Sequence, residues 1–163
     1  MADDGLAAHA REVVDATRYL TLGTVDDDGN PWTAPVYFAP ADERTFLWVS
    51  EAGALHSRYL AARPRVSVVV FDSTVAPYHG RAVYAVGDAR ELSGDDLDRA
   101  LRHYPRPAAD GSTSVTREDV TGDAPYRLYG FTASDLWVLC PREPRQPCPL
   151  HGIAADHRAH VPA

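Results

Sequence analysis

The chain opens with a helical pattern of apolar positions and then changes to strand-forming runs. Apolar side chains recur at helical spacing over residues 6–18, with Asp3 or Asp4 available as the N-cap. Residues 19–25 are rich in strand formers and end in a strong turn signal at 26–30. Further strands are predicted over 32–39 and, after a turn at 40–44, over 45–50. This part of the chain predicts one helix and three antiparallel strands in succession.

The middle of the chain predicts a second short helix between strands. Residues 51–62 have helical spacing, and Pro64 stops that helix. Residues 66–71 are nearly continuous in β-branched and apolar side chains, which predicts a central strand covered on both faces. A loop over 72–80 leads to a long strand over 81–92, in which Gly87 marks a bulge or bend.

The last third mixes a helix, a long loop and more strand. Ser93 is a good N-cap for a helix ending at Tyr104, before Pro105. Residues 106–122 form a polar loop with one helical turn near 117–120, and 126–132 with 136–140 predict a final hairpin. We therefore expect a single domain over 1–163 that is mainly β with flanking α, its antiparallel sheet closing into a barrel, with 1–9 and 141–163 as flexible or extended tails.

Composition narrows the possible functions. The net charge of −7 and the absence of lysine give no attraction for a phosphate backbone, so a nucleic-acid partner is not expected. Any phosphate site must use arginine, histidine, hydroxyls or backbone N–H groups. No run approaches ~20 apolar residues and the N-terminus lacks a basic leader pattern, so we expect a cytoplasmic protein without a membrane partner.

The best candidate for an anion site is the segment from Trp48 to Arg58. It runs from a strand through a glycine turn into a helix, so hydroxyl, imidazole, guanidinium and free helix amides can converge on one phosphate. The alternative is that Ser50 only caps the helix while His56 and Arg58 face water. The local chemistry leaves both open.

The order of three segments resembles a known family. They are TLGTVDDDGNPWTAPVYFA, FLWVSEAGALHSRYLAARPRVSVVVFDS and AVYAVGDARELS. The chain resembles, over about residues 10 to 140, the pyridoxamine 5'-phosphate oxidase-like FMN-binding split barrels. The resemblance implies an antiparallel split β-barrel that forms a homodimer and binds FMN.

The resemblance also assigns residues to the cofactor. It places Ser50, His56, Ser57 and Arg58 at the flavin phosphate, and it places a further group of residues along the isoalloxazine and ribityl chain: Pro35, Val36, Trp48 and Val49. Since each site lies at a dimer interface, additional contacts are assigned to Arg81, Tyr84 and Trp137. For Trp137, a core or dimer contact is the alternative, and for Arg81 the alternative is that it faces water. A basic residue is common at the His56 position; a histidine there predicts that phosphate affinity falls as the pH rises.

The implied activity is an FMN-dependent oxidoreductase acting on a small molecule, with NAD(P)H as a possible partner. No catalytic residue can be nominated, because the flavin itself carries the hydride. Ala82 stands where the vitamin B6 oxidases have a flavin-binding glutamine, so oxidation of vitamin B6 is not expected. Two alternatives stay open: an F420-dependent reductase, and a non-catalytic flavin- or haem-binding protein with His56, His79, His103 or a tail histidine as the haem ligand.

The C-terminal segment carries two cysteines and three histidines. Cys140 and Cys148 form no C-x-x-C frame, and the spacing of His151, His157 and His160 matches no metal motif. We therefore expect a reduced cysteine pair, a flexible tail and no metal site.

Overall fold

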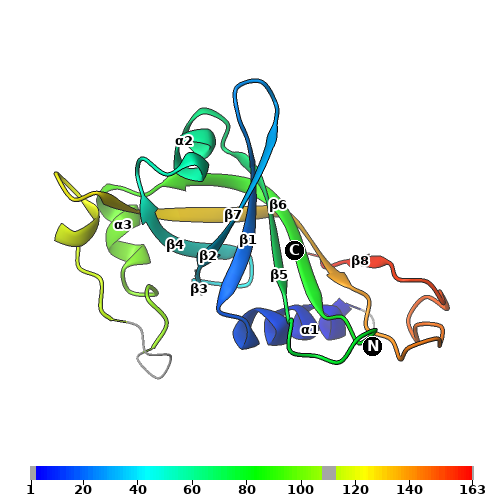
Figure 1. Cartoon of the computed structure of the whole chain (residues 1–163). Coiled ribbons are helices and arrows are strands. Elements are labelled where there is room, and N and C mark those ends of the chain that lie inside the picture. Colours follow the sequence, from blue (N-terminus) through cyan, green and yellow to red (C-terminus); the bar gives the residue numbers. More distant parts are fainter. Residues whose placement is uncertain (1–2, 108–112, 163) are drawn as a thin grey trace.

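The structure is a computed structural model that describes residues 3–107 and 113–162. One antiparallel sheet curls around the core in the order β2-β1-β5-β6-β7-β4-β3, and β8 pairs with β7 (Figure 1). The helices are α1 (Asp3–Ala16), α2 (Leu55–Ala62) and α3 (Gly94–Ala100), with a short 3-10 turn at Glu118–Val120. The strands are β1 (Tyr19–Val25), β2 (Pro31–Tyr37), β3 (Ala39–Pro40), β4 (Thr45–Glu51), β5 (Arg65–Phe71), β6 (Ala82–Glu91), β7 (Tyr126–Leu139) and β8 (Arg158–His160). The prediction of a mainly β protein with an antiparallel half-barrel sheet is confirmed.

The core lies inside the curl of the sheet. Alternate residues of β1, β4, β5, β6 and β7 are buried in the core, together with Leu6, Ala10, Val13 and Val14 of α1. Helix α1 lies beside the lower part of the sheet (Figure 1). A second apolar cluster joins the other face of β4 to α3 and the 3-10 turn. The two faces of β4 therefore pack into two different apolar clusters.

Strand β5 is central, but it is covered on one face only. It lies between β1 and β6, and its inward residues Val66, Val68 and Val70 are buried. Its outward face is open, since Phe71 is 50% exposed. The predicted burial of both faces is wrong for the single chain, because no helix within residues 3–107 and 113–162 covers the outer face of this strand.

The predicted final hairpin is instead one long strand. Residues 126–139 form β7, which pairs with β6 on one side and with β4 on the other. The segment 132–135, with three polar residues, imitates a turn signal but forms a bulge, where the register shifts between Val86 and Gly87. The Ser134 hydroxyl donates to the Val86 carbonyl at 3.1 Å, which satisfies a polar group of the bulge. The bulge that Gly87 predicted is confirmed.

The first three predicted strands do not all pair with their neighbours along the chain. Strand β2 pairs with β1, while β4 pairs with β3 and β7. Residues 3–9 belong to α1, and 158–160 form β8 on the edge of β7, so both predicted tails contain regular structure. Among the described residues, no helix is both long enough and apolar enough to cross a lipid bilayer.

Candidate functional site

The end of β4 and the start of α2 bring Ser50 and His56 into contact. A tight turn joins the two elements, with the Ala54 N–H donating to the Glu51 carbonyl at 3.2 Å. This turn brings the Nε2 atom of His56 within 2.9 Å of the Ser50 hydroxyl. Both side chains are partly exposed, so they remain accessible to a ligand.

The N-terminus of α2 has the properties of an anion site. The N-cap residue Ala54 supplies no side-chain cap, and the first turn contains no acidic residue. The free N–H groups and the positive end of the helix dipole therefore have no carboxylate to satisfy them there. Arg58 lies one turn further on; it is exposed, and no ion pair holds its guanidinium within the described part of the chain.

Burial affects the charge of His56. Desolvation holds the pKa of the imidazole below its ordinary value, so in the free protein this ring is neutral at physiological pH. A neutral ring has one N–H to donate, either to Ser50 or to a ligand. The predicted fall of phosphate affinity with rising pH should therefore occur below neutral pH, where the His56 imidazole loses its proton.

Ser57 faces the interior rather than the anion site. Its side chain is 2% exposed and lies beside the phenol of Tyr129. Burial raises the pKa of that phenol, while the Ser57 hydroxyl acts in the opposite direction. The buried Ser57 side chain therefore packs against β7, and only its backbone N–H is available at the start of the helix.

Trp48 and Val49 point to opposite faces of β4. Trp48 is fully buried and stacks on Tyr129 at 6.0 Å between ring centroids, whereas Val49 is partly buried against the second cluster. Val36 is also buried, at 6% exposure. Of this group, Trp48 and Val36 belong to the main core cluster rather than to an exposed cofactor surface.

Other predicted residues lie together on the outer face of the sheet. The register aligns one residue from each of five neighbouring strands in a row across that face: Pro35, Thr21, Val69, Tyr84 and Trp137. Pro35 is exposed and the other four are partly exposed. This row is a continuous, largely apolar strip, and β8 covers part of one end of it: the Arg158 guanidinium lies 4.3 Å from the centroid of the Tyr84 ring, and the His160 ring meets Trp137 edge-on.

Arg81 does not join either group. Its guanidinium forms an ion pair of 2.8 Å with Glu12 of α1. It therefore ties the start of β6 to the helix, away from the turn between β4 and α2.

Comparison with known sequences identifies the fold. The sequence profile described as pyridoxamine 5'-phosphate oxidase matches residues 6–140, which is most of the chain. The chain belongs to the pyridoxamine 5'-phosphate oxidase-like family. This result confirms the resemblance seen in the sequence.

Two curated relatives are pyridoxine/pyridoxamine 5'-phosphate oxidases. The protein of Streptomyces avermitilis is 28% identical over 130 residues, covering 76% of this chain and 55% of the relative. That of Sodalis glossinidius is 28% identical over 107 residues, covering 64% and 46%. The chain thus spans about half the length of the curated relatives that it matches.

Solved structures with the same fold have diverse descriptions. A haem-binding protein of Mycobacterium smegmatis superposes with a TM-score of 0.67 at 20% identity, covering 95% of this chain and 57% of the other. A FAD-binding protein of Mesorhizobium loti has a TM-score of 0.60 at 21% identity, covering 80% and 91%. A Clostridium acetobutylicum protein related to general stress protein 26 has a TM-score of 0.64 at 13% identity, covering 98% and 96%. At these identities the likeness establishes the fold alone.

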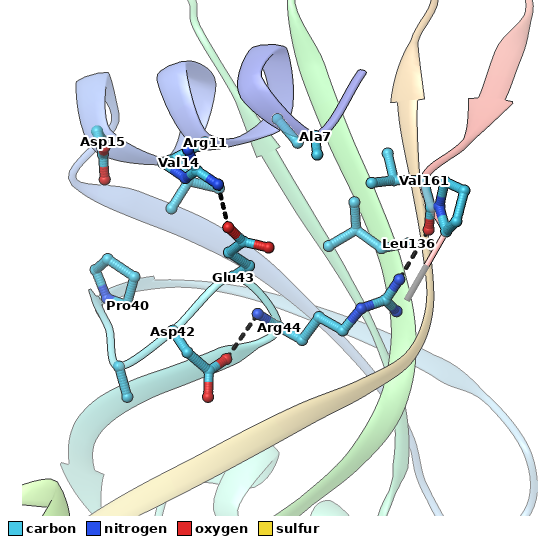
Figure 2. Close-up of a pocket in the computed structure, with 13 residues that line it drawn as sticks. Ala7, Arg11, Val14, Asp15, Pro40, Asp42, Glu43, Arg44, Leu136 and Val161 are labelled. Carbon is cyan, nitrogen blue, oxygen red and sulfur yellow. Dashed lines mark hydrogen bonds and ion pairs between the residues drawn. The ribbon is translucent and has the colours of Figure 1, made fainter. Parts of the chain in front are cut away.

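In this family member, a cavity of about 230 Å³ lies away from the predicted site (Figure 2). It is bordered by α1, the turn at 40–44, and the ends of β7 and the C-terminal segment. Its charged side chains already contact protein partners: Arg11 pairs with Glu43, and Arg44 donates to the Val161 carbonyl at 2.8 Å (Figure 2). These contacts indicate a structural role in joining the C-terminus to α1.

Sequence reasoning missed one cation near the anion site. Arg127 is the partner of Ser50 in the ladder between β4 and β7, so the two residues share one face of the sheet. Its guanidinium donates to the carbonyls of Gly122 and Tyr126 at 2.9 and 2.7 Å and lies 3.3 Å from Glu91. The strand register that brings Arg127 beside Ser50 has no signal in the local sequence.

Proposed function

We propose that this chain binds FMN and acts as a flavin-dependent oxidoreductase of its family, working as a homodimer on a small-molecule substrate. The observation that carries the proposal is the contact of His56 with Ser50 beside the uncapped start of α2. A phosphate monoester fits this arrangement, because each of its oxygens can accept hydrogen bonds from N–H and O–H groups.

The donors at this place suit a phosphate dianion. His56 and Ser50 offer side-chain donors, the first turn of α2 offers backbone N–H groups, and Arg58 offers an unpaired guanidinium among the described residues. Arg127 adds positive charge on the same side of β4 as Ser50. Glu91 pairs with that guanidinium, but the first turn of α2 contains no acidic residue, so no carboxylate there offsets the positive end of the helix dipole.

The partly exposed apolar strip on the outer sheet face supports the homodimer. A largely apolar row from Pro35 to Trp137 is the kind of surface that soluble proteins bury against a partner. Two copies of the same strip can face each other about a twofold axis. A flavin ring needs such an apolar wall, whereas its phosphate needs the donors beside α2.

A bound flavin would supply the hydride chemistry through its N5 atom. The residues of the chain would hold the phosphate, orient the ring and exclude water from it. The FAD-binding and haem-binding neighbours make FAD and haem the ligands to compare with FMN, and F420 remains the alternative deazaflavin.

The test compares FMN with riboflavin, which differs only in lacking the phosphate. Tryptophan quenching measures both affinities for the native chain, for Ser50→Ala and Arg58→Ala, and for the control Arg102→Ala. Arg102 is an exposed arginine just after α3. We expect a preference for FMN that falls about tenfold in Ser50→Ala and Arg58→Ala and is unchanged in Arg102→Ala.

Each other result has a distinct meaning. An equal preference for FMN in all four proteins would place the phosphate elsewhere. Absence of flavin binding, with saturable binding of F420 or a Soret band on adding haem, would replace FMN with that ligand. In a further outcome, the bound FMN does not complete a redox cycle, in which NADH, NADPH or a chemical donor reduces it and an acceptor then reoxidises it. That result would indicate a flavin-binding protein rather than an oxidoreductase.

A further inference from the structure

A second cluster of chemically reactive side chains lies outside the proposed flavin site. Cys140 directly follows the last residue of β7. The other three residues, Cys148, His151 and His157, lie on the segment that leads to β8. One potential ligand atom from each residue lies within 4.8 Å of the other three. The two thiols are buried, at 4% and 2% exposure, and His151 is exposed at the rim.

The spacing of these atoms is that of a coordination sphere. The sulfur atoms of Cys140 and Cys148 lie 3.5 and 3.4 Å from Nδ1 of His151, and Cys148 Sγ lies 3.5 Å from Nε2 of His157. The two imidazole nitrogens are 3.2 Å apart. Zinc–sulfur and zinc–nitrogen bond lengths around a tetrahedron require about 3.6 Å between sulfur and nitrogen and about 3.3 Å between nitrogens.

Hydrogen bonding alone does not account for this convergence. Nδ1 of His151 faces two sulfur atoms and a second ring nitrogen, yet a single ring nitrogen has one proton or one lone pair in the ring plane. A cation at the centre would satisfy all four groups together.

The surrounding backbone orients the four residues. The second ring nitrogen of His157 lies 3.0 Å from the Ala155 carbonyl, which fixes Nδ1 as the protonated atom and leaves Nε2 to face the cluster. The His151 N–H donates to Cys148 Sγ at 3.1 Å, and the Cys140 N–H donates to the His157 carbonyl at 2.9 Å.

The turn from Cys148 to Ile153 is a compact loop that holds two of the four side chains. The Gly152 N–H donates to the Cys148 carbonyl at 2.9 Å, and the Cys148 N–H donates to the Ile153 carbonyl at 2.9 Å. Gly152 has a φ of 68°, a left-handed conformation that favours glycine. The spacing Cys-x-x-His within this turn matches the short ligand spacing of structural zinc sites.

The segment buries little apolar surface, although Arg142 pairs with Asp156 and Leu150 packs against the core. Between residues 141 and 157, Cys148 alone is buried, and the other side chains are partly or fully exposed. A short segment that buries so little apolar surface needs another source of stability, which a metal ion provides.

We propose that Cys140, Cys148, His151 and His157 bind one zinc ion in a closed tetrahedral site. Two sulfur and two nitrogen ligands favour zinc, and four protein ligands leave no open position for catalysis. On binding, the two thiols release their protons to solvent, and the two thiolates balance the charge of Zn²⁺. The ion fixes the segment 141–157 to the end of β7 and so presents β8 to its partner strand. The proposal is independent of flavin binding and differs from the sequence prediction of no metal site.

The first measurement is the zinc content of the full chain, purified without a histidine tag and without chelator. We expect about one zinc per chain, with X-ray absorption showing two sulfur neighbours at about 2.3 Å and two nitrogen neighbours at about 2.0–2.1 Å. Cys148→Ser and His151→Gln should lose the zinc, whereas the control His160→Gln should keep it. His160 lies on the same C-terminal segment but outside the cluster.

A second measurement keeps the test valid if the variants fail to fold. The native chain is stripped with chelator under reducing conditions and titrated with Co²⁺. We expect a thiolate-to-cobalt charge-transfer band and the intense visible bands of tetrahedral cobalt. A metal-free chain that gives neither band, or zinc retained by both Cys148→Ser and His151→Gln, overturns the proposal. Recovery of a Cys140–Cys148 disulfide with no zinc in the freshly purified chain also overturns it.

Discussion

Replacing Gly87 with alanine should strongly destabilise the fold. Gly87 lies on β6 at the bulge in its pairing with β7. A Cβ added at Gly87 would lie 2.0 Å from the Thr132 carbonyl oxygen and 2.8 Å from the Ala133 Cα. Every one of these close atoms is main chain, so no side-chain rotation can relieve the overlap. The two strands would have to separate by about 1.3 Å to restore an ordinary carbon–oxygen contact of ~3.3 Å.

The size of the effect follows from that displacement. Overpacking of a well-packed interior costs about 1–3 kcal/mol, and each weakened ladder hydrogen bond adds about 1 kcal/mol. We expect Gly87→Ala to lower the free energy of unfolding by roughly 3 kcal/mol. For a chain of this size, that loss corresponds to a decrease in Tm of about 6–12 °C.

The assay is urea and thermal unfolding followed by circular dichroism at one fixed protein concentration. The matched control is Gly53→Ala, because no atom lies within 4 Å of a Cβ added at Gly53. We expect the control to change the free energy of unfolding by less than about 0.5 kcal/mol. The reasoning is refuted if Gly87→Ala is as stable as the native chain, or if both variants lose the same stability.

Three further predictions concern packing, pH and assembly. Arg106 is buried and donates to three main-chain carbonyl oxygens at 2.9–3.0 Å, so Arg106→Met should lower the unfolding free energy by about 3–5 kcal/mol in urea; a loss below about 1 kcal/mol would contradict this. Burial, aided at His9 by a nearby arginine, lowers the pKa of His9 and His56 below 6.5. Because the unfolded chain then binds more protons, the contribution of these two groups to stability should be complete above about pH 6.5 and should fall as the pH drops below it. Replacing both histidines with glutamine should make the urea unfolding midpoint less dependent on pH between about pH 7 and 5.5. If the native chain sediments as the proposed dimer, Trp137→Asp should shift it to a monomer, and a variant that stays dimeric would show that the outer sheet face is not the interface.

Local sequence patterns predicted elements better than their pairing. The strands predicted from side-chain type over 19–25, 45–50 and 66–71 correspond to β1, β4 and β5, and the bulge followed from Gly87. The hairpin over 126–140 was wrong because the segment 132–135 satisfies its polar groups within a bulge instead of a turn. The open face of β5 was missed because continuous apolar sequence does not reveal whether the covering partner lies in the same chain.

The same distinction separates the parts of the proposed flavin site. Ser50 and His56 are six residues apart, so a strand, a turn and a helix bring them together without help from the rest of the fold. Arg127 comes beside Ser50 only through the register of β7. Arg81 was assigned by resemblance, and its ion pair with Glu12 depends on where α1 packs. Contacts made within one contiguous segment were predictable, and contacts set by packing were not.

The cysteine and histidine cluster combines both situations. Half of it, Cys148 and His151, lies in one compact turn whose spacing could have suggested a metal ligand pair. The other half depends on how β7 ends and how the chain returns toward β8, which no spacing rule encodes. The family profile ends at residue 140, where the cluster begins, so the resemblance carried no information about the segment that follows. The geometry of the segment itself carries the inference. Four ligand atoms converge where the chain buries little apolar surface, and a bound ion explains this convergence best.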